Sequence, residues 1–205
     1  METKELFSER RSITFIDKDR GLSDQTLKEI INLAVMAPSA FNLQPWRIIA
    51  VKTEDSKKKL FELSNKQDKV LEAPVTLIIV GNKEGYANNN PVWDEMLRSV
   101  GGNEEMVVGA KQAALFLYGS SDERKLKFAE SNAGILGMAI MVAAKDYDVD
   151  SHPMSGIDFD GIHKEFNLND GEAAVMTISL GYYDKSRKLY PRRPRRLFNE
   201  IASIV

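Results

Sequence analysis

The chain has 205 residues, 43% of them hydrophobic, which fits one globular domain able to bury its own core. Its formal net charge of -2 gives no overall reason to expect a nucleic-acid or anionic-membrane partner. The absence of cysteine excludes disulfides, thiolate metal sites and cysteine nucleophiles, and suits a cytoplasmic location.

Two other classes are also disfavoured. The charged N-terminus lacks the apolar run of a signal peptide, and we expect no stretch of the roughly 18 apolar residues that a membrane span needs. His152 and His163 lie apart in sequence, so we expect no metal site built on histidine.

The first half of the chain contains clear element signals. In order, they are a helix after the N-cap residue Ser23, a loop over 38–45, a strand over 47–52 and an amphipathic helix over 56–65. Apolar residues recur at helical spacing from Leu27 to Val35, and Pro38 ends that helix.

The second half predicts longer elements. They are a buried strand over 74–81, helix fragments over 85–109 that could cap a site, a helix over 124–147, a helix over 159–166 and a buried strand over 173–181. The helix over 124–147 is rich in alanine and glycine, so it should pack closely on more than one side. A basic tail over 185–196 leads to the apolar residues Leu197, Phe198, Ile201 and Ile204.

This order favours an α+β layered domain spanning 1–205. No Gly-x-Gly-x-x-Gly follows a strand and no phosphate-binding Gly-Lys-Ser/Thr loop is present, which disfavours a dinucleotide-binding Rossmann domain.

Four polar segments could carry chemistry. The pair Arg10-Arg11 with Ser12, and the basic run over 192–196, suit the oxygens of a phosphate. The Pro-bounded loop over 38–45 offers Ser39, Asn42 and Gln44 to the edge of a heteroaromatic ring, and Gly156 in 152–156 allows close backbone approach. Each also has a plainer interpretation as a solvated charge cluster, a turn or a solvated tail; the basic run could also be a nucleic-acid patch.

Taken together, these segments resemble the nitroreductase family of flavoproteins. The specific match is Ala37-Pro-Ser-x-x-Asn-x-Gln-Pro-Trp46, and Arg10-Arg-Ser-Ile-x-Phe15 is similar to the family's opening element. Gln67 before Ala73-Pro74, then Pro153-Met-x-Gly156 and Leu180-Gly-Tyr182, follow in family order.

The resemblance implies a mainly antiparallel sheet flanked by helices in three layers, with FMN held between two subunits of a homodimer and the C-terminal arm exchanged. The implied contacts to FMN phosphate and ribityl chain are Arg10, Arg11, Ser12, Arg193 and Arg195. Those from the partner's loop are Pro38, Ser39, Ala40, Asn42 and Gln44. Gln67 would meet the ribityl or ring region, and Pro153, Met154, Ser155 and Gly156 would line the ring.

The implied activity is an NAD(P)H oxidoreductase that passes a hydride through flavin N5 to a nitroaromatic, quinone or activated alkene in ping-pong order, with no catalytic side chain. Thr14 stands where some members carry a lysine, and Ser155 where some carry a glutamate, so flavin tuning and donor preference stay open. The alternatives on the same fold are a non-enzymatic flavin-binding or storage protein and a reductive dehalogenase-like relative.

Overall fold

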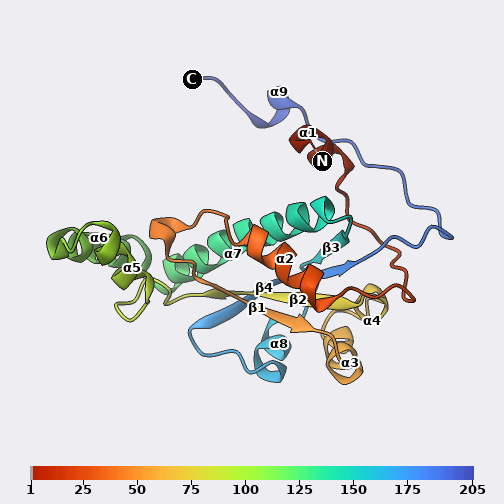
Figure 1. Cartoon of the computed structure of the whole chain (residues 1–205), viewed down its shortest axis with the longest axis horizontal. Helices are drawn as coiled ribbons and strands as arrows, with labels where there is room; N and C mark the ends of the chain where they lie inside the picture. Colours follow the sequence, from red (N-terminus) through yellow and green to blue (C-terminus); the bar gives the residue numbers. More distant parts are fainter. Residues whose placement is uncertain (1) are drawn as a thin grey trace.

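The computed structural model describes residues 2–205, which form a four-stranded sheet between helices (Figure 1). The strands are β1 (Trp46–Val51), β2 (Val75–Asn82), β3 (Asp150–Met154) and β4 (Glu172–Gly181). Their order is β1-β2-β4-β3 and every neighbouring pair is antiparallel. The strands β2 and β4 are therefore central, as their apolar runs predict.

The helices occupy the connections between and beyond these strands. They are α1 (Thr3–Glu9), α2 (Asp24–Ala34), the 3₁₀ turn η1 (Ala40–Asn42), α3 (Glu54–Glu62), α4 (Lys69–Glu72), α5 (Val92–Ser99), α6 (Glu104–Tyr118), α7 (Asp122–Asp146), α8 (Phe159–Glu165) and α9 (Phe198–Ile201). The N-cap prediction is confirmed, because the Ser23 side chain accepts a hydrogen bond from the Thr26 backbone N–H at the start of α2.

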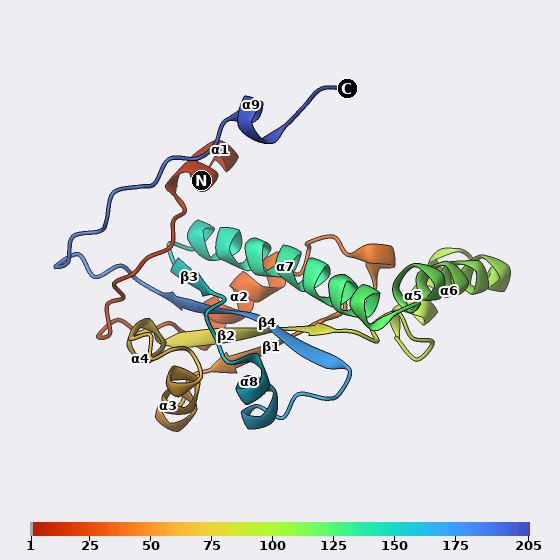
Figure 2. The ribbon, with the colours of Figure 1, turned by 180° about the vertical axis from the view of Figure 1, so that it is seen from behind.

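Both faces of the sheet are covered. Along β2, Leu77 and Ile79 pack in one core cluster with α2 and α7, whereas Ile78 and Val80 pack in a second cluster with α3 and α8. Figure 2 shows α7 on one face and α3 and α8 on the other. The predicted three-layer α+β architecture is confirmed, and double-sided burial explains why β2 lacks apolar-polar alternation.

The small residues of α7 allow the helix to lie close to the sheet. A Cβ atom on Gly81 of β2 would come within 2.8 Å of the Ala129 carbonyl oxygen of α7. Gly137 similarly faces the Met176 sulfur of β4, where an added Cβ would be 3.0 Å away. Close contact thus explains part of the small-residue pattern, but Gly134 faces open space.

Helix α7 bears on the expectation that no stretch of the chain is apolar enough to span a membrane. Among the described helices, it alone is long and apolar enough to span a membrane. Half of its most apolar window is buried inside the protein, in contact with the sheet and α2. Its apolarity is that of a core helix.

Helices α5 and α6 extend beyond the end of the sheet (Figure 1). A third, smaller cluster, which includes Trp93, Val107 and Phe128, joins them to the start of α7. The region predicted as helix fragments is therefore two defined helices, and α6 continues well beyond the expected range to Tyr118.

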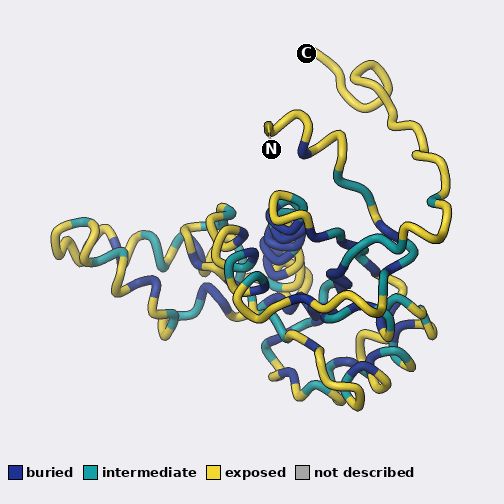
Figure 3. The backbone as a smooth tube through the Cα atoms, turned by 45° about the vertical axis from the view of Figure 1, so that its right-hand side comes forward, coloured by how far each residue is buried: buried dark blue, intermediate teal, exposed yellow. Residues whose placement is uncertain are grey.

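Several short elements also differ from the sequence prediction. The segment from His152 to Met154, expected as a turn, belongs to β3, and the short helices α1 and α4 were not predicted. The chain after Lys185 runs along the outside of the domain, and Figure 3 shows its exposed backbone. Leu197, Phe198 and Ile201 are all exposed there.

Candidate functional site

The opening Arg-Ser element lies along the edge strand β3. Ser12 forms a parallel bridge with Ser151, and the Ile13 backbone N–H donates to the Ser151 carbonyl at 3.0 Å. His152 Nδ1 donates to the Ile13 carbonyl oxygen at 2.9 Å. These contacts hold residues 10–13 beside the strand that ends at Met154, so two of the predicted site segments are neighbours.

The basic tail returns to this element. Arg192 donates hydrogen bonds to the backbone carbonyls of Glu9 and Arg10. Partial burial, and then the positive charges of Arg192 and Arg195, lower the pKa of Arg10 below its ordinary value. Three guanidinium groups are thus close together without a carboxylate within 4 Å among the described residues. Such a cluster is able to hold a multiply charged anion.

The segment over 65–69 lies beside the residues that follow β3. Asn65 Nδ2 donates to the Gly156 carbonyl at 3.0 Å, and Lys69 Nζ donates to Gln67 Oε1 at 3.1 Å. Lys69 is half-buried, and burial lowers its pKa. Gln67 therefore lies near the 153–156 segment, with a cation that the sequence analysis did not single out.

His152 joins these groups and makes stability depend on pH. Burial first, and then the charge of Lys69, lower the pKa of His152. In the unfolded chain the histidine pKa is about 6.5, so as the pH falls the unfolded chain binds a proton at His152 at a higher pH than the folded chain does. Stability linked to His152 is therefore present above about pH 6.5 and is lost as pH falls through the lower folded pKa.

The free energy of unfolding of the parent should decrease as the pH falls from about 7.5 to 5.5, and we expect this decrease to be smaller in His152→Asn. Asparagine can still donate to the Ile13 carbonyl but does not titrate. Urea denaturation at several pH values measures the slope. Equal slopes for the variant and the parent would show that His152 does not cause the change.

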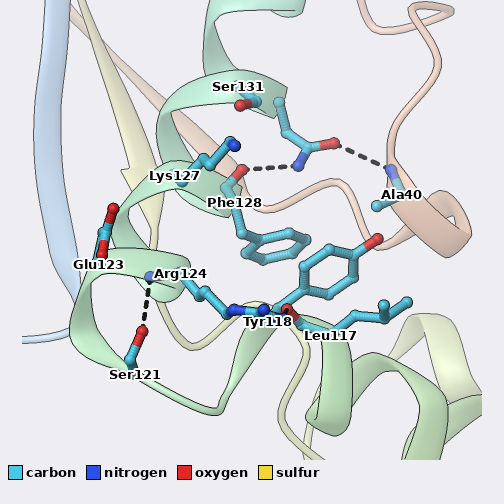
Figure 4. Close-up of a pocket in the computed structure, with 10 residues that line it drawn as sticks. Ala40, Leu117, Tyr118, Ser121, Glu123, Arg124, Lys127, Phe128 and Ser131 are labelled. Carbon is cyan, nitrogen blue, oxygen red and sulfur yellow. Dashed lines mark hydrogen bonds between the residues drawn. The ribbon is translucent and has the colours of Figure 1, made fainter.

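The loop over 38–45 has a strained backbone. Phe41, Asn42 and Gln44 have φ values of 51°, 56° and 47°. These values lie in the left-handed region, which residues other than glycine rarely adopt. The Ser39 hydroxyl accepts from the Gln44 backbone N–H at 3.0 Å. Buried Asn132 of α7 accepts from the Ala40 N–H at 3.0 Å (Figure 4). The loop is thus held in one shape, with Asn42 and Gln44 exposed.

This loop lies apart from the other four segments within one chain. It is anchored on the N-terminal half of α7 beside α5 and α6, whereas β3 follows the C-terminal end of α7 (Figure 1). The structure therefore brings together the segments around Ser12, Gln67, Gly156 and Arg195, and leaves the loop over 38–45 outside that group.

Several predicted side chains have other contacts. Arg11 donates to the Tyr190 carbonyl and lines a polar cavity of about 700 Å³ together with Arg20, Lys145 and Arg192. The Arg193 carbonyl accepts from Arg195 Nη1 at 3.0 Å. Arg192 and Lys69 were missed: Arg192 stood in a basic run with no sign of which member reaches Arg10, and Lys69 carried no motif.

Comparison with known proteins identifies relatives of this chain. The family model described as the nitroreductase family matches residues 7–182. MhqN of Bacillus subtilis, whose name assigns it NAD(P)H nitroreductase activity, is 30% identical over all of this chain and 99% of its own length.

Solved structures agree on the fold. A B. subtilis structure, titled as nitroreductase ydfN, has a TM-score of 0.90 at 29% identity over 98% of each chain. A nitroreductase structure from Exiguobacterium sibiricum, titled as a complex with FMN, has a TM-score of 0.84 at 24% identity, over 99% of this chain and 97% of that one.

Proposed function

We propose that this chain, which belongs to the nitroreductase family, is an NAD(P)H-dependent oxidoreductase that binds FMN between two copies of itself. Bound FMN would supply the redox chemistry, taking a hydride from NAD(P)H and giving it to a flat electrophile such as a nitroaromatic, quinone or activated alkene. Donor and electrophile would use the same place in turn, in ping-pong order. We also propose that the protein works in the cytoplasm, which the absence of cysteine favours.

The guanidinium cluster carries the cofactor part of this proposal. Arg10, Arg192 and Arg195 gather positive charge, with no carboxylate within 4 Å of them among the described residues. Partial burial, and then repulsion from Arg192 and Arg195, lower the Arg10 pKa. A terminal phosphate would relieve that repulsion and accept charge-assisted hydrogen bonds. Ser12 lies in the same element, and Arg11 and Arg193 stay predicted helpers. Residues in the described chain therefore fit the monophosphate of FMN.

The ring would lie against the segment after β3. Met154 ends the strand, and Ser155 and Gly156 are exposed beyond it. Gly156 has room for close approach, since an added Cβ would meet only the Asn65 side-chain nitrogen, at 3.4 Å. The backbone N–H groups of this segment could then donate to the ring edge.

A second copy would complete the site. The Ser39–Gln44 loop presents polar groups on a strained, well-anchored backbone, yet it is remote from the guanidinium cluster of its own chain. Two copies related by a twofold axis could place each loop against the other copy's cluster, giving two equivalent sites. An apolar groove of about 620 Å³ between α1, α2 and α7, lined by Phe7, Ile135 and Met138, supports such an interface.

The test is to release the cofactor by heat, identify it by chromatography, and mix the holoprotein anaerobically with NADH or NADPH. We expect FMN as the released species and bleaching of flavin absorbance by at least one donor. FAD as the main species would overturn the FMN assignment. FMN without bleaching by either donor would favour the flavin-storage alternative, and turnover only with halogenated substrates would favour the dehalogenase-like alternative.

We further propose that Lys69 provides positive charge beside the bound ring. It would replace the lysine that some members of the family carry at the position of Thr14. Its ammonium group is half-buried next to Gln67 and acts on His152, directly before the predicted ring segment. Positive charge there would stabilise the reduced, anionic cofactor.

Lys69→Met is expected to make the two-electron midpoint potential of the bound flavin more negative by roughly 30 mV, equivalent to about 1.4 kcal/mol. Anaerobic redox titration against a reference dye measures this shift. Lys66→Met removes a more exposed charge three residues earlier and should leave the potential nearly unchanged. Equal potentials for the parent and Lys69→Met would remove Lys69 from this role.

A further inference from the structure

A cavity of about 630 Å³ lies between the end of α6, the start of α7 and the loop over 38–45. Its floor is aromatic: the Tyr118 and Phe128 rings stack with centroids 4.5 Å apart and planes at 25°. Phe41 meets Tyr118 edge-on, with centroids 6.3 Å apart, so the strained loop and the cavity share a wall. Flat molecules suit such a surface.

The same cavity has a net positive charge, because Arg124 and Lys127 outnumber Glu123 among the residues that line it. Arg124, Lys127 and Ser131 line it from successive turns of α7, since residues three or four apart share a helix face. Arg124 Nη1 makes one long hydrogen bond, 3.4 Å, to the Leu117 carbonyl. Within the described residues, neither cation has a carboxylate within 4 Å, whereas the intervening Lys125 pairs with Glu84 at 3.1 Å.

Figure 4 shows how these groups are arranged. The Tyr118 and Phe128 rings lie side by side and the Arg124 side chain reaches beneath them, whereas the Glu123 side chain, which also lines the cavity, points away from the rings. Buried Asn132 holds the cavity wall by accepting from the Ala40 N–H and donating to the Phe128 carbonyl at 2.7 Å. An aromatic surface with two unpaired cations is therefore built on a firmly held frame.

We propose that this cavity binds a flat molecule carrying an anionic group, with the ring near Tyr118 and Phe128 and the anion contacting Arg124 and Lys127. This inference rests on the proposed function: the bound molecule could react only because the adjoining loop would face the partner's flavin. The anion could be an acidic substituent of the electrophile or the 2′-phosphate of NADPH, and both offer the same oxygens to these cations.

Calorimetric titration of the FMN-loaded protein with 4-nitrobenzoate and its neutral isostere 4-nitrobenzamide tests the anion site directly. We expect the parent to bind the carboxylate more tightly. The double variant Arg124→Gln/Lys127→Gln should lose that preference, with a decrease in carboxylate affinity of roughly tenfold, because the cations are exposed and partly screened. Lys58→Gln, which removes an exposed charge from α3 on the opposite face of the sheet, should keep the preference.

A second arm identifies the source of the anion. If the Michaelis constant for NADPH rises in the double variant and that for NADH does not, the site holds the 2′-phosphate. If only the benzoate preference is lost, it holds the electrophile. Unchanged benzoate preference together with an unchanged NADPH-to-NADH ratio would overturn the inference. A parent that is not reduced by either donor but still prefers the carboxylate would overturn the proposed function alone.

Discussion

Arg10→Ala and Arg195→Ala are each expected to weaken FMN binding by roughly tenfold to a hundredfold. A charge-assisted hydrogen bond to phosphate is worth about 1.5–3 kcal/mol, and each variant would remove one such contact. The structure adds Arg192 as a third cation near Arg10, so either single variant should retain some affinity. Equilibrium dialysis of the apoprotein with FMN, at fixed ionic strength, gives the dissociation constants.

Lys58→Ala is the control for this series. Lys58 is exposed on α3, on the face of the sheet opposite α7 and away from the loop over 38–45. It should leave FMN affinity within twofold of the parent. Full FMN retention by both Arg10→Ala and Arg195→Ala would mean that the phosphate lies elsewhere.

Gly134→Leu is expected to dissociate the homodimer and release FMN with it. In a single chain, a Cβ atom on Gly134 would meet nothing within 4 Å, and its neighbour Ile135 is 44% exposed. Leucine also favours a helix over glycine by roughly 0.5–1 kcal/mol, so an isolated chain should tolerate or gain from the change. A loss can only come from a surface packed against this position, where overpacking costs about 1–3 kcal/mol.

Gly134→Ala separates helix propensity from volume. Alanine improves the propensity of α7 but adds one methyl group, so this variant should remain dimeric and hold FMN. Sedimentation velocity across a range of concentrations measures the assembly, and flavin absorbance of the sedimenting species measures occupancy. A parent protein that sediments as a monomer at micromolar concentration while retaining FMN would refute the shared site.

Sequence periodicity was sufficient to predict the helices and strands that bury a regularly spaced set of side chains. The helix after Ser23, the two central strands and the long helix ending near Tyr147 were all predicted within a few residues. Their side chains repeat at the helix period or form continuous apolar runs, which are local properties of the chain.

The elements that were missed lack such a repeat. The strand β3 contains Pro153, which cannot donate to a ladder, and only its place at the edge of the sheet makes that tolerable. At four residues, α4 is too short to show a period. The start of α6 lies in the range predicted as helix fragments, but its continuation to Tyr118 was missed.

The sequence by itself determined the family, the three-layer fold class and the segments that carry polar chemistry, because these follow from local patterns and their order. Tertiary structure alone decided that Arg10 meets Arg192, which lies 182 residues later, and that the charge of Lys69 acts on His152. It also decided that the Ser39–Gln44 loop is remote from both. Contacts between distant segments depend on how the chain closes in space, and no local pattern encodes that closure.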